Sequence, residues 1–499
     1  MFKKNKEKDE NTITITRKVQ LFPVGDKKEV SRVYNFLCDC ISTQNRTMNQ
    51  AMSSIYSSAL LEATKEDRDL LSNMIGRTNK KFKNGKPNGS IYGEDLSFPE
   101  EFKIPANVKQ RVNKDFSNAN KHNALLKGET SLPSYNKNNP FMILPELLRP
   151  ISNSKQKFGF YYEYQDFDEF LSHLYSDLDV FLKFPNDITF KCIFGNPRRS
   201  AELRNVFKNI FDGTYDVRGS TIGLKNTKII LNLSISIPKK NTVLDESLSV
   251  GVDLGLAIPA MCSLSSNVYM RKFIGSKDDF LRVRQKIQAQ RRRLQKSLTY
   301  TSGGHGREKK LQALDRFKDY ERNWVKTYNH YVSHAVVDFA EKSRAKYINL
   351  EYLKGFGSQD KNKFILRNWS YYELQQQIKY KAEKSNIIVR YVNPCYTSQV
   401  CSCCGHWEEG QRVSQDTFIC NNPECENYGV KINADFNASR NIAMSRLFVD
   451  EEAMKKVKDP AETLKKEAAA YYSIPYVSDE EPEEKPKKAK RKPRSKKAA

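Results

Sequence analysis

Three carboxylates and one group of cysteines follow each other in an order that restricts the fold more than any other feature of this chain. Asp253 ends the segment LSVGVD, Glu351 ends KYINLE, and Asp435 lies at the predicted start of a helix in KINADFNASRNIA. The first two segments contain the apolar and β-branched residues typical of short strands. Four cysteines with paired spacing come shortly before Asp435. The three acids come from distant segments, so the fold has to gather them.

From residue 248 onward, alternating strand and helix signals predict an α/β domain. Three short strands, at 248–253 and around AMCSLS and VYMRKFIG, precede a basic helix through RVRQKIQAQRRRLQKS. After a break at TYTSGGHGRE, a second helix covers about 308–343. Then come the strand KYINLE, the helix WSYYELQQQIKYKAEK, the strand IIVRYV, the cysteines and a helix from about 436. This is the element order of an RNase H-like fold, in which we expect Asp253 and Glu351 to lie side by side.

Carboxylates gathered in this way suit divalent cations. Mg²⁺ prefers hard oxygen ligands, and two such ions about 3.5–4 Å apart activate water and stabilise the leaving oxygen in phosphodiester hydrolysis. We therefore expect two Mg²⁺ ions, with Asp253 bridging both and Glu351 and Asp435 each holding one. Asn437 is expected to orient a phosphate or water, and Arg440 to meet the scissile phosphate. Each carboxylate alone is better explained as an exposed acid or a helix cap, but their joint order favours a two-metal nuclease.

Six of the ten cysteines fall between residues 395 and 425, which is a reduced, metal-binding pattern rather than a disulfide framework. Two pairs have the C-x₂-C and C-x₄-C spacing that suits one structural, tetrahedral Zn²⁺: Cys401 with Cys404, and Cys420 with Cys425. Cys403 and His406 are competing ligands. His330 and His334, four residues apart on a predicted helix, lack a further ligand motif and are better interpreted as an ordinary helix face.

The formal net charge of +25 and the pI of about 9.4 favour a polyanionic partner, because cationic side chains release the counterions condensed on phosphates. We expect the arginine-rich helix to contact a nucleic-acid backbone, although a solvated helix is the simpler alternative. The expected contacts are Arg282, Arg284, Arg291, Arg292, Arg293 and Lys296.

The N-terminal half predicts a small β-domain interrupted by a helical lobe. Alternating residues at 12–22, at 188–194 and at 231–237 indicate strands, and the intervening region to about 184 is mostly helical, polar and basic. The sequence contains no run of about 20 apolar residues that would predict a membrane span, and we expect no secretory signal from its first residues. The tail from about 451 starts helix-like and ends in a charge block that cannot bury a core, so we expect its final stretch to be disordered.

The segments GVDLG, INLE, YTSQVCSCCG and ADFNASRNIA resemble the nuclease half of the transposon-encoded TnpB proteins and of the miniature type V-F CRISPR effector nucleases. The resemblance covers roughly 248–447, and the N-terminal half is similar only in layout. At 499 residues the chain is longer than a typical TnpB, which favours the CRISPR effector. One departure is Ala434, where many TnpB proteins have Arg. Cys38 and Cys40 do not complete the N-terminal zinc finger of some relatives.

The resemblance implies a multidomain α/β and α+β protein. Its expected parts are a β-barrel wedge domain (1–26 and 185–245), a helical recognition lobe (27–184), a RuvC, RNase H-like nuclease domain (246–395 and 431–450), a zinc-binding insert for the target nucleic acid (396–430), and a helix followed by a disordered basic tail (451–499). It also implies catalytic Asp253, Glu351 and Asp435, and zinc-binding Cys401, Cys404, Cys420 and Cys425.

The activity implied is RNA-guided cleavage of double-stranded DNA beside a short recognised motif, in CRISPR immunity. A homodimer around one guide RNA in a prokaryotic cytoplasm is expected by the same resemblance. Three alternatives stay open. The first is a transposon-associated, TnpB-type RNA-guided nuclease with the same chemistry. The second is an RNase H-like transposase or junction resolvase that needs no guide, and the third is a non-catalytic, zinc-containing regulator that binds nucleic acid.

Overall fold

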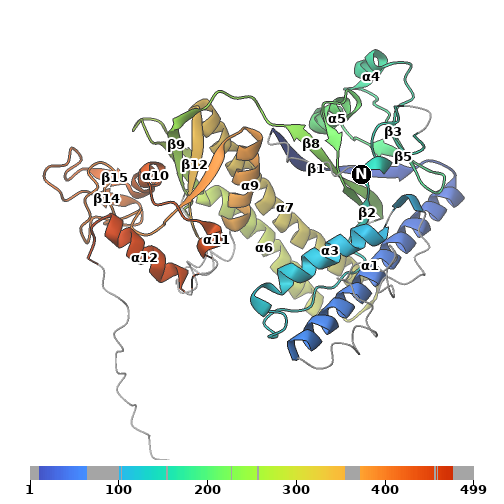
Figure 1. Cartoon of the computed structure of the whole chain (residues 1–499), viewed down its shortest axis with the longest axis horizontal. Helices are drawn as coiled ribbons and strands as arrows, with labels where there is room; N and C mark the ends of the chain where they lie inside the picture. The colour runs from blue at the N-terminus through green and yellow to red at the C-terminus, as the bar shows by residue number, and fades with distance from the viewer. Residues whose placement is uncertain are drawn as a thin grey trace, which may run out of the picture. The chain divides into compact units, whose positions relative to one another are not determined.

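The computed structural model describes residues 11–64, 100–102, 104–152, 156–225, 227–255, 258–353, 371–454, 457 and 459–475. The chain divides into two compact units, Met1–Pro238 and Lys239–Ala499 (Figure 1). The expected disordered end of the tail, from residue 476, lies outside the described residues. In the part of the chain that the structure describes, every helix is too short or too polar to cross a membrane.

The first unit is built on an eight-stranded sheet, in which strands far apart in the sequence pair with one another. Its strands are β1 (Thr12–Pro23), β2 (Phe141–Ile143), β3 (Gly159–Tyr161), β4 (Phe181–Phe184), β5 (Ile188–Ile193), β6 (Asp216–Val217), β7 (Ser220–Lys225) and β8 (Lys228–Pro238). The order is β2-β7-β8-β1-β5-β4-β3, with β6 also paired to β8. Among the described residues, the outer strands β2 and β3 are not paired with each other, and the sheet is a curled half-barrel where we expected a β-barrel.

Buried apolar and more exposed polar side chains alternate along the strands, and this alternation determines which side of the sheet is buried. Ile13, Ile15, Val19 and Leu21 of β1 are buried, and β8 contributes a matching buried row. Strands β1 and β8 pair antiparallel from Thr12 opposite Pro238 to Leu21 opposite Ile229. The expected pairing of distant strands in one sheet is therefore correct.

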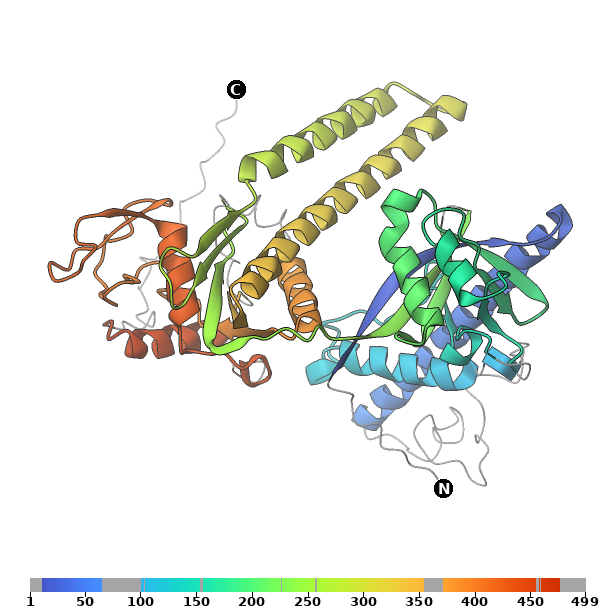
Figure 2. The same ribbon diagram turned by 90° about the horizontal axis from the view of Figure 1, so that it is seen from above.

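Helices of the first unit pack beside this sheet. They are α1 (Lys27–Thr64), α3 (Ile104–Ala119), α4 (Phe167–His173) and α5 (Pro197–Phe211), with short 3₁₀ turns at Glu100–Phe102, Lys121–Asn123 and Pro145–Leu147. The buried side of α1 follows helical spacing at Val33, Leu37, Ile41 and Met48. Helix α3 contacts α1, and Figures 1 and 2 both show the two helices side by side.

The expected helical lobe, 27–184, contains sheet as well as helix. Strands β2, β3 and β4 lie within this range and pair with β7, β4 and β5. The first two are only three residues long, so an alternating pattern had too few positions to indicate them. The sheet thus extends well into the region that we had assigned to the lobe.

The second unit has a five-stranded mixed sheet in the order β11-β10-β9-β12-β13. Its strands are β9 (Asp245–Asp253), β10 (Ala260–Leu264), β11 (Arg271–Ile274), β12 (Ala345–Glu351) and β13 (Ile388–Val392). Strands β9, β12 and β13 run parallel, whereas β10 and β11 are antiparallel to their neighbours. The expected order of strands and helices and the central position of β9 and β12 are correct.

Helices α6 (Lys277–Thr299) and α7 (Gly304–Lys342) form a long hairpin, which Figure 2 shows beside the sheet, and α9 (Tyr371–Lys384) packs on α7. A small two-stranded sheet, β14 (Thr417–Ile419) and β15 (Lys431–Asn433), leads directly into α10 (Ala434–Met444). Two shorter helices follow, α11 (Glu451–Met454) and α12 (Pro460–Tyr471). Helix α10 contacts β9, β10 and β12.

Candidate active site

The ends of β9 and β12 bring the first two predicted carboxylates together. In the parallel register, Leu350 lies opposite Val252, so Glu351 and Asp253 follow side by side at the carboxyl ends of these strands. This adjacency is what the strand order in the sequence predicted. Both residues keep some solvent exposure, which leaves the strand ends accessible.

The third carboxylate is placed by close contact between α10 and the sheet. A Cβ atom at Gly251 would collide with the backbone of Ser439 and Ala443, so only glycine lets α10 approach β9 this closely. At the start of α10, Asn433 accepts a hydrogen bond from Phe436 N at 2.9 Å and caps the helix. Asp435 therefore lies in the first helical turn, and a Cβ at Gly255 would be 3.7 Å from its Oδ2.

The three carboxylates share one electrostatic environment. Burial raises the pKa of Asp253 well above its ordinary value, and the neighbouring Glu351 and Asp435 raise it further. Burial is also the main cause that raises the pKa of Glu351 and of Asp435. Like charges held this closely destabilise their ionised forms unless a cation offsets them. Carboxylate oxygens are the kind of ligand that Mg²⁺ prefers. In the part of the chain that the structure describes, however, the group of side chains placed closely enough to hold a metal ion is that of the four cysteines.

Arg412 is a site residue that our sequence analysis missed. The positive charge of its guanidinium partly opposes the rise in the pKa of Asp253, Glu351 and Asp435. It comes from the cysteine-rich insert, where its Nη2 donates to Gln415 O at 3.2 Å. No spacing motif marks this arginine, and its electrostatic effect on the three acids is what identifies it.

Glu351 is held in place by two further segments. The Thr397 hydroxyl donates to Glu351 Oε1 at 2.7 Å, and Gln375 Nε2 of α9 donates to the Glu351 carbonyl oxygen at 2.9 Å. Thr397 is almost completely buried, and its own carbonyl accepts from Asn441 Nδ2 of α10 at 2.7 Å. A single chain of hydrogen bonds thus joins the Glu351 carboxylate to the helix that carries Asp435.

Asn437 has a different role from the one predicted for it. It is fully buried, its Oδ1 accepts from Ser402 N at 2.8 Å, and its Nδ2 donates to Val400 O at 2.8 Å. Two residues along a helix from Asp435 is about 200° around the axis, so the two side chains face apart. Asn437 therefore fastens the cysteine-bearing loop to α10 instead of orienting a phosphate.

Arg440 likewise does not reach the carboxylates. It is 8% exposed, and its Nη1 donates to the carbonyl oxygens of Leu264 and Ser265 at the end of β10. Burial lowers the pKa of its guanidinium. The fifth residue after Asp435 is again far around the helix, which explains the wrong prediction. Arg440 ties α10 to the sheet.

The four cysteines predicted for zinc come together as one cluster. The Sγ atoms of Cys401, Cys404, Cys420 and Cys425 all lie within 4.8 Å of one another. Such a set of four convergent thiols fits a tetrahedral structural Zn²⁺. Cys404 faces Cys420 at 3.7 Å between sulfurs, and Cys401 faces Cys425 at 3.9 Å. Cys403 and His406, the competing ligands, are not part of this cluster.

The basic residues predicted on α6 fall into two groups. Arg284 and Arg291 form ion pairs with Glu321 of α7 at 3.0 and 2.8 Å, so they hold the helical hairpin together. Arg282, Arg292, Arg293 and Lys296 are exposed, and Arg282 lies 3.7 Å from Asp279. The remaining three, Arg292, Arg293 and Lys296, are the strongest candidates for contacts with phosphates.

Known proteins are similar to this chain in sequence and in fold. Residues 371–442, which carry α9, the cysteine cluster and Asp435, match the family described as Cas12f1-like, TNB domain. A CRISPR-associated endodeoxyribonuclease Cas12f1 from Sulfoacidibacillus thermotolerans is 31% identical over 328 residues, which cover 65% of this chain and 72% of that protein. A protein of the same name from Syntrophomonas palmitatica is 34% identical over 248 residues, or 44% of this chain and 49% of that protein.

The fold is similar to that of the protein in a cryo-EM structure of the Cas12f1-sgRNA-target DNA complex. The TM-score is 0.60 at 18% sequence identity, and the match covers 88% of this chain and all of that chain (100%). The sequence match, which covers 72% of a relative at 31% identity, places the chain in the class of CRISPR-associated endodeoxyribonucleases. The chain belongs to the Cas12f1 family, and the resemblance seen in its motifs is confirmed.

Proposed function

We propose that this protein cleaves double-stranded DNA at sites selected by a guide RNA. The observation that carries the proposal is the placement of Asp253 and Glu351 at adjacent strand ends, with Asp435 on the helix packed against them, in a member of a family of CRISPR-associated endodeoxyribonucleases. In this interpretation, the second unit contributes the RuvC, RNase H-like nuclease domain with its zinc insert. The half-barrel and its helices act as the wedge domain and recognition lobe.

Each residue of the site has a role in the proposed hydrolysis. Asp253, Glu351 and Asp435 would hold two Mg²⁺ ions, which supply an activated water and stabilise the leaving oxygen of the phosphodiester. Thr397 orients the Glu351 carboxylate through its 2.7 Å hydrogen bond. Arg412 places a positive charge where the substrate phosphate meets the three acids, and such a charge favours the transition state over the ground state.

The partners follow from the same proposal. The exposed cations of α6 would contact the backbone of the guide RNA or of its heteroduplex with DNA. We extend to this chain, as part of the proposal, a homodimer around one guide RNA.

The test begins with protein expressed together with its native flanking locus, from which the bound RNA is sequenced. Asp253→Asn keeps the shape of the side chain and removes its charge. We expect this variant to bind RNA and target DNA normally and to lose Mg²⁺-dependent cleavage of the matching duplex. Asp338→Asn, an acid on α7 that pairs with Lys342, is the control and should cut at the parent rate.

Two results would contradict the proposal. Retained cleavage by Asp253→Asn would show that this carboxylate is not needed for hydrolysis. Cleavage that survives complete removal of the bound RNA would indicate an unguided nuclease instead.

A further inference from the structure

The C-terminal helix α12 packs on the loop that supports Glu351, although α12 follows all three carboxylates in the chain. The loop spans residues 393–400, between β13 and the first cysteine of the cluster. It carries Thr397, whose hydroxyl donates to Glu351 Oε1 at 2.7 Å. Figure 1 shows α12, in red, at the edge of the second unit. The predicted nuclease domain ends at residue 450, and the proposed cleavage chemistry makes no use of α12.

Local sequence signals define both ends of α12. At its start, the Asp459 carboxylate accepts two hydrogen bonds of 3.1 Å from backbone N–H groups of the first turn. At its end, Ser473 has a left-handed φ of 56°, and Ile474 N donates to Ala469 O at 2.8 Å. This is a Schellman ending, in which an apolar residue just beyond the helix folds back onto the last turn. The ending therefore fixes the position of Ile474 relative to α12.

An apolar cluster forms the first contact between α12 and the loop. Val400 is buried with Ala469 and Ile474, in a cluster separate from the core of the five-stranded sheet. Tyr396 and Trp407 pack on this cluster, with 6.2 Å between their ring centroids. Its members come from the loop, from the insert and from α12, so the cluster stays out of water only while α12 is docked.

A hydrogen bond forms the second contact. Asn393 Nδ2 donates at 2.7 Å to the carbonyl oxygen of Leu464, within α12. The other end of the same amide, Oδ1, accepts from Cys395 N at 3.0 Å. Asn393 is 2% exposed, and a buried amide donor that loses its partner is strongly destabilising. This side chain therefore holds the helix and the loop at one spacing.

The backbone of the loop is strained next to Thr397. Tyr396 has a φ of 64°, in the left-handed region that residues other than glycine rarely adopt. Its carbonyl oxygen accepts from Gln399 N at 2.9 Å and from Val400 N at 3.0 Å, which closes a tight turn around Thr397. Strain of this kind persists only where the surrounding structure holds it, and it gathers at functional sites. Here the surroundings include both contacts with α12.

We propose that α12 is a positioning element of the active site, acting on Glu351 through the loop at 393–400. Its two contacts hold the strained turn in shape, and the turn holds the Thr397 hydroxyl on the Glu351 carboxylate. When α12 is released, Tyr396 relaxes toward ordinary backbone conformations, and the carboxylate loses the donor that orients it. The inference rests on the proposed function in one respect, namely that Glu351 is one of the acids of DNA cleavage.

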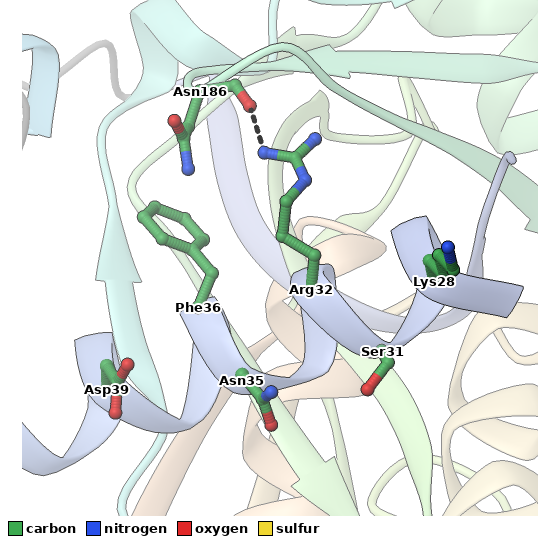
Figure 3. A pocket seen from close by; sticks show the side chains of 7 residues that line it. All are labelled: Lys28, Ser31, Arg32, Asn35, Phe36, Asp39 and Asn186. Carbon is green, nitrogen blue, oxygen red and sulfur yellow. Dashed lines mark hydrogen bonds between the residues drawn. The ribbon is translucent and has the colours of Figure 1, made fainter. Parts of the chain in front are cut away.

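The first test needs no cleavage. Hydrogen exchange of the Gln399 and Val400 amides, whose hydrogen bonds close the turn, is measured in the complete chain. We expect faster exchange in Asn393→Ala, and also in Ile474→Ala, which changes the α12 side alone. The matched amide control is Asn35→Ala, because Asn35 is an exposed residue of a hollow on α1 in the first unit (Figure 3). Parent-like exchange in both test variants would overturn the inference.

The second test separates positioning from a loss of stability, by a double-mutant cycle on single-turnover cleavage. Thr397→Val keeps the shape of the side chain and removes its hydroxyl, and we expect about tenfold slower cleavage. Asn393→Ala should slow cleavage several-fold in the parent but not further in Thr397→Val, because both changes act on the same hydrogen bond. Thr397→Ser, which keeps the hydroxyl, should cut at nearly the parent rate.

Glu467→Ala, on the exposed face of α12, is the control and should leave both the exchange and the rate unchanged. Equal slowing by Asn393→Ala in both backgrounds would contradict the inference, because the effect would then bypass Thr397. Parent-like cleavage by Thr397→Val, with Asp253→Asn inactive, would also overturn it. Activity of Asp253→Asn would count against the proposed function instead.

Discussion

At the scale of single residues, Arg412 is the most informative side chain of the site. It acts on three carboxylates at once, although it belongs to a different segment from all of them. We expect Arg412→Ala to lower the rate of DNA cleavage by about 10²-fold, the usual loss when one group that stabilises a transition state is removed. RNA binding and zinc content should be unchanged.

The measurement is single-turnover cleavage at a series of Mg²⁺ concentrations up to saturation, with Arg446→Ala as the control. A parent-like rate for Arg412→Ala would show that its charge does not reach the reacting phosphate. A loss that extra Mg²⁺ fully restores would assign the arginine to metal binding alone.

Lys381 of α9 makes the free energy of unfolding depend on pH through a single side chain. Burial lowers its pKa from 10.5 to about 8, while its Nζ donates to His330 O at 2.6 Å and to Ser333 Oγ at 2.7 Å. Between these two pH values the unfolded chain holds the proton and the folded chain releases it. The contribution of Lys381 to the free energy of unfolding therefore rises as the pH goes from about 8 to 10.5.

Lys381→Met removes this titration. We expect the stability of the parent relative to the variant to increase with pH over that range, as measured by urea unfolding at a series of pH values. A difference that is constant with pH would contradict the lowered pKa.

The sequence predicted the positions of the strand-end carboxylates and of the cysteines better than the positions of the side chains around them. Asp253 and Glu351 end strands whose order sets their adjacency, and the cysteine spacing restricts which sulfurs can converge. Asn437 and Arg440 were misassigned because nearness in sequence to Asp435 does not place side chains on one helix face. Arg412 depends on how a loop folds over distant strands, which no local pattern specifies.

At the scale of elements, the α6–α7 hairpin combines support and binding in one arginine-rich stretch. Glu321 accepts hydrogen bonds from Arg284, Gln288 and Arg291. Burial raises the pKa of Glu321, but these hydrogen bonds lower the pKa by more, so it lies below its usual value. The run of basic residues was visible in the sequence, but its division into paired and exposed side chains depends on α7.

This division gives an element-level prediction. Combined replacement of Arg292, Arg293 and Lys296 by alanine should weaken RNA binding and reduce the slope of log affinity against log salt by about 3, or about one for each cationic side chain that no longer neutralises a phosphate. Arg284→Ala should instead lower the melting temperature, because it breaks a partly buried ion pair.

Filter-binding titrations from low to high salt provide the slopes, and thermal melts provide the stabilities. If the triple variant keeps the parent slope, the outer face of α6 is not a phosphate-binding surface.

At the scale of the whole molecule, the cysteine cluster and the active site form one connected structure. Val400, Ser402 and Thr397 of the cysteine-bearing segment all bond to Asn437 or Asn441 of α10. Removing zinc should therefore loosen the insert, Arg412 and α10 together, and cleavage should fall by more than about 10-fold. The half-barrel unit has its own core and should keep its fold.

Cys401→Ser should lower the zinc content and the cleavage rate together, whereas Cys403→Ser, outside the cluster, should keep both. Fluorescence of Trp407, which packs against Tyr396 in the insert, reports the loosening directly. Zinc-free protein that cuts at the parent rate would contradict the coupling.

The position of the insert also determines when the site is completed during synthesis. Ribosomes add about 5–20 residues per second from the N-terminus, so β9 and β12 emerge with two carboxylates well before the rest. Asp435 follows all four cysteines in the chain. A product that terminates early, anywhere before α10, therefore lacks the third carboxylate, and under the proposed mechanism we expect such fragments to be inert instead of acting as unguided nucleases.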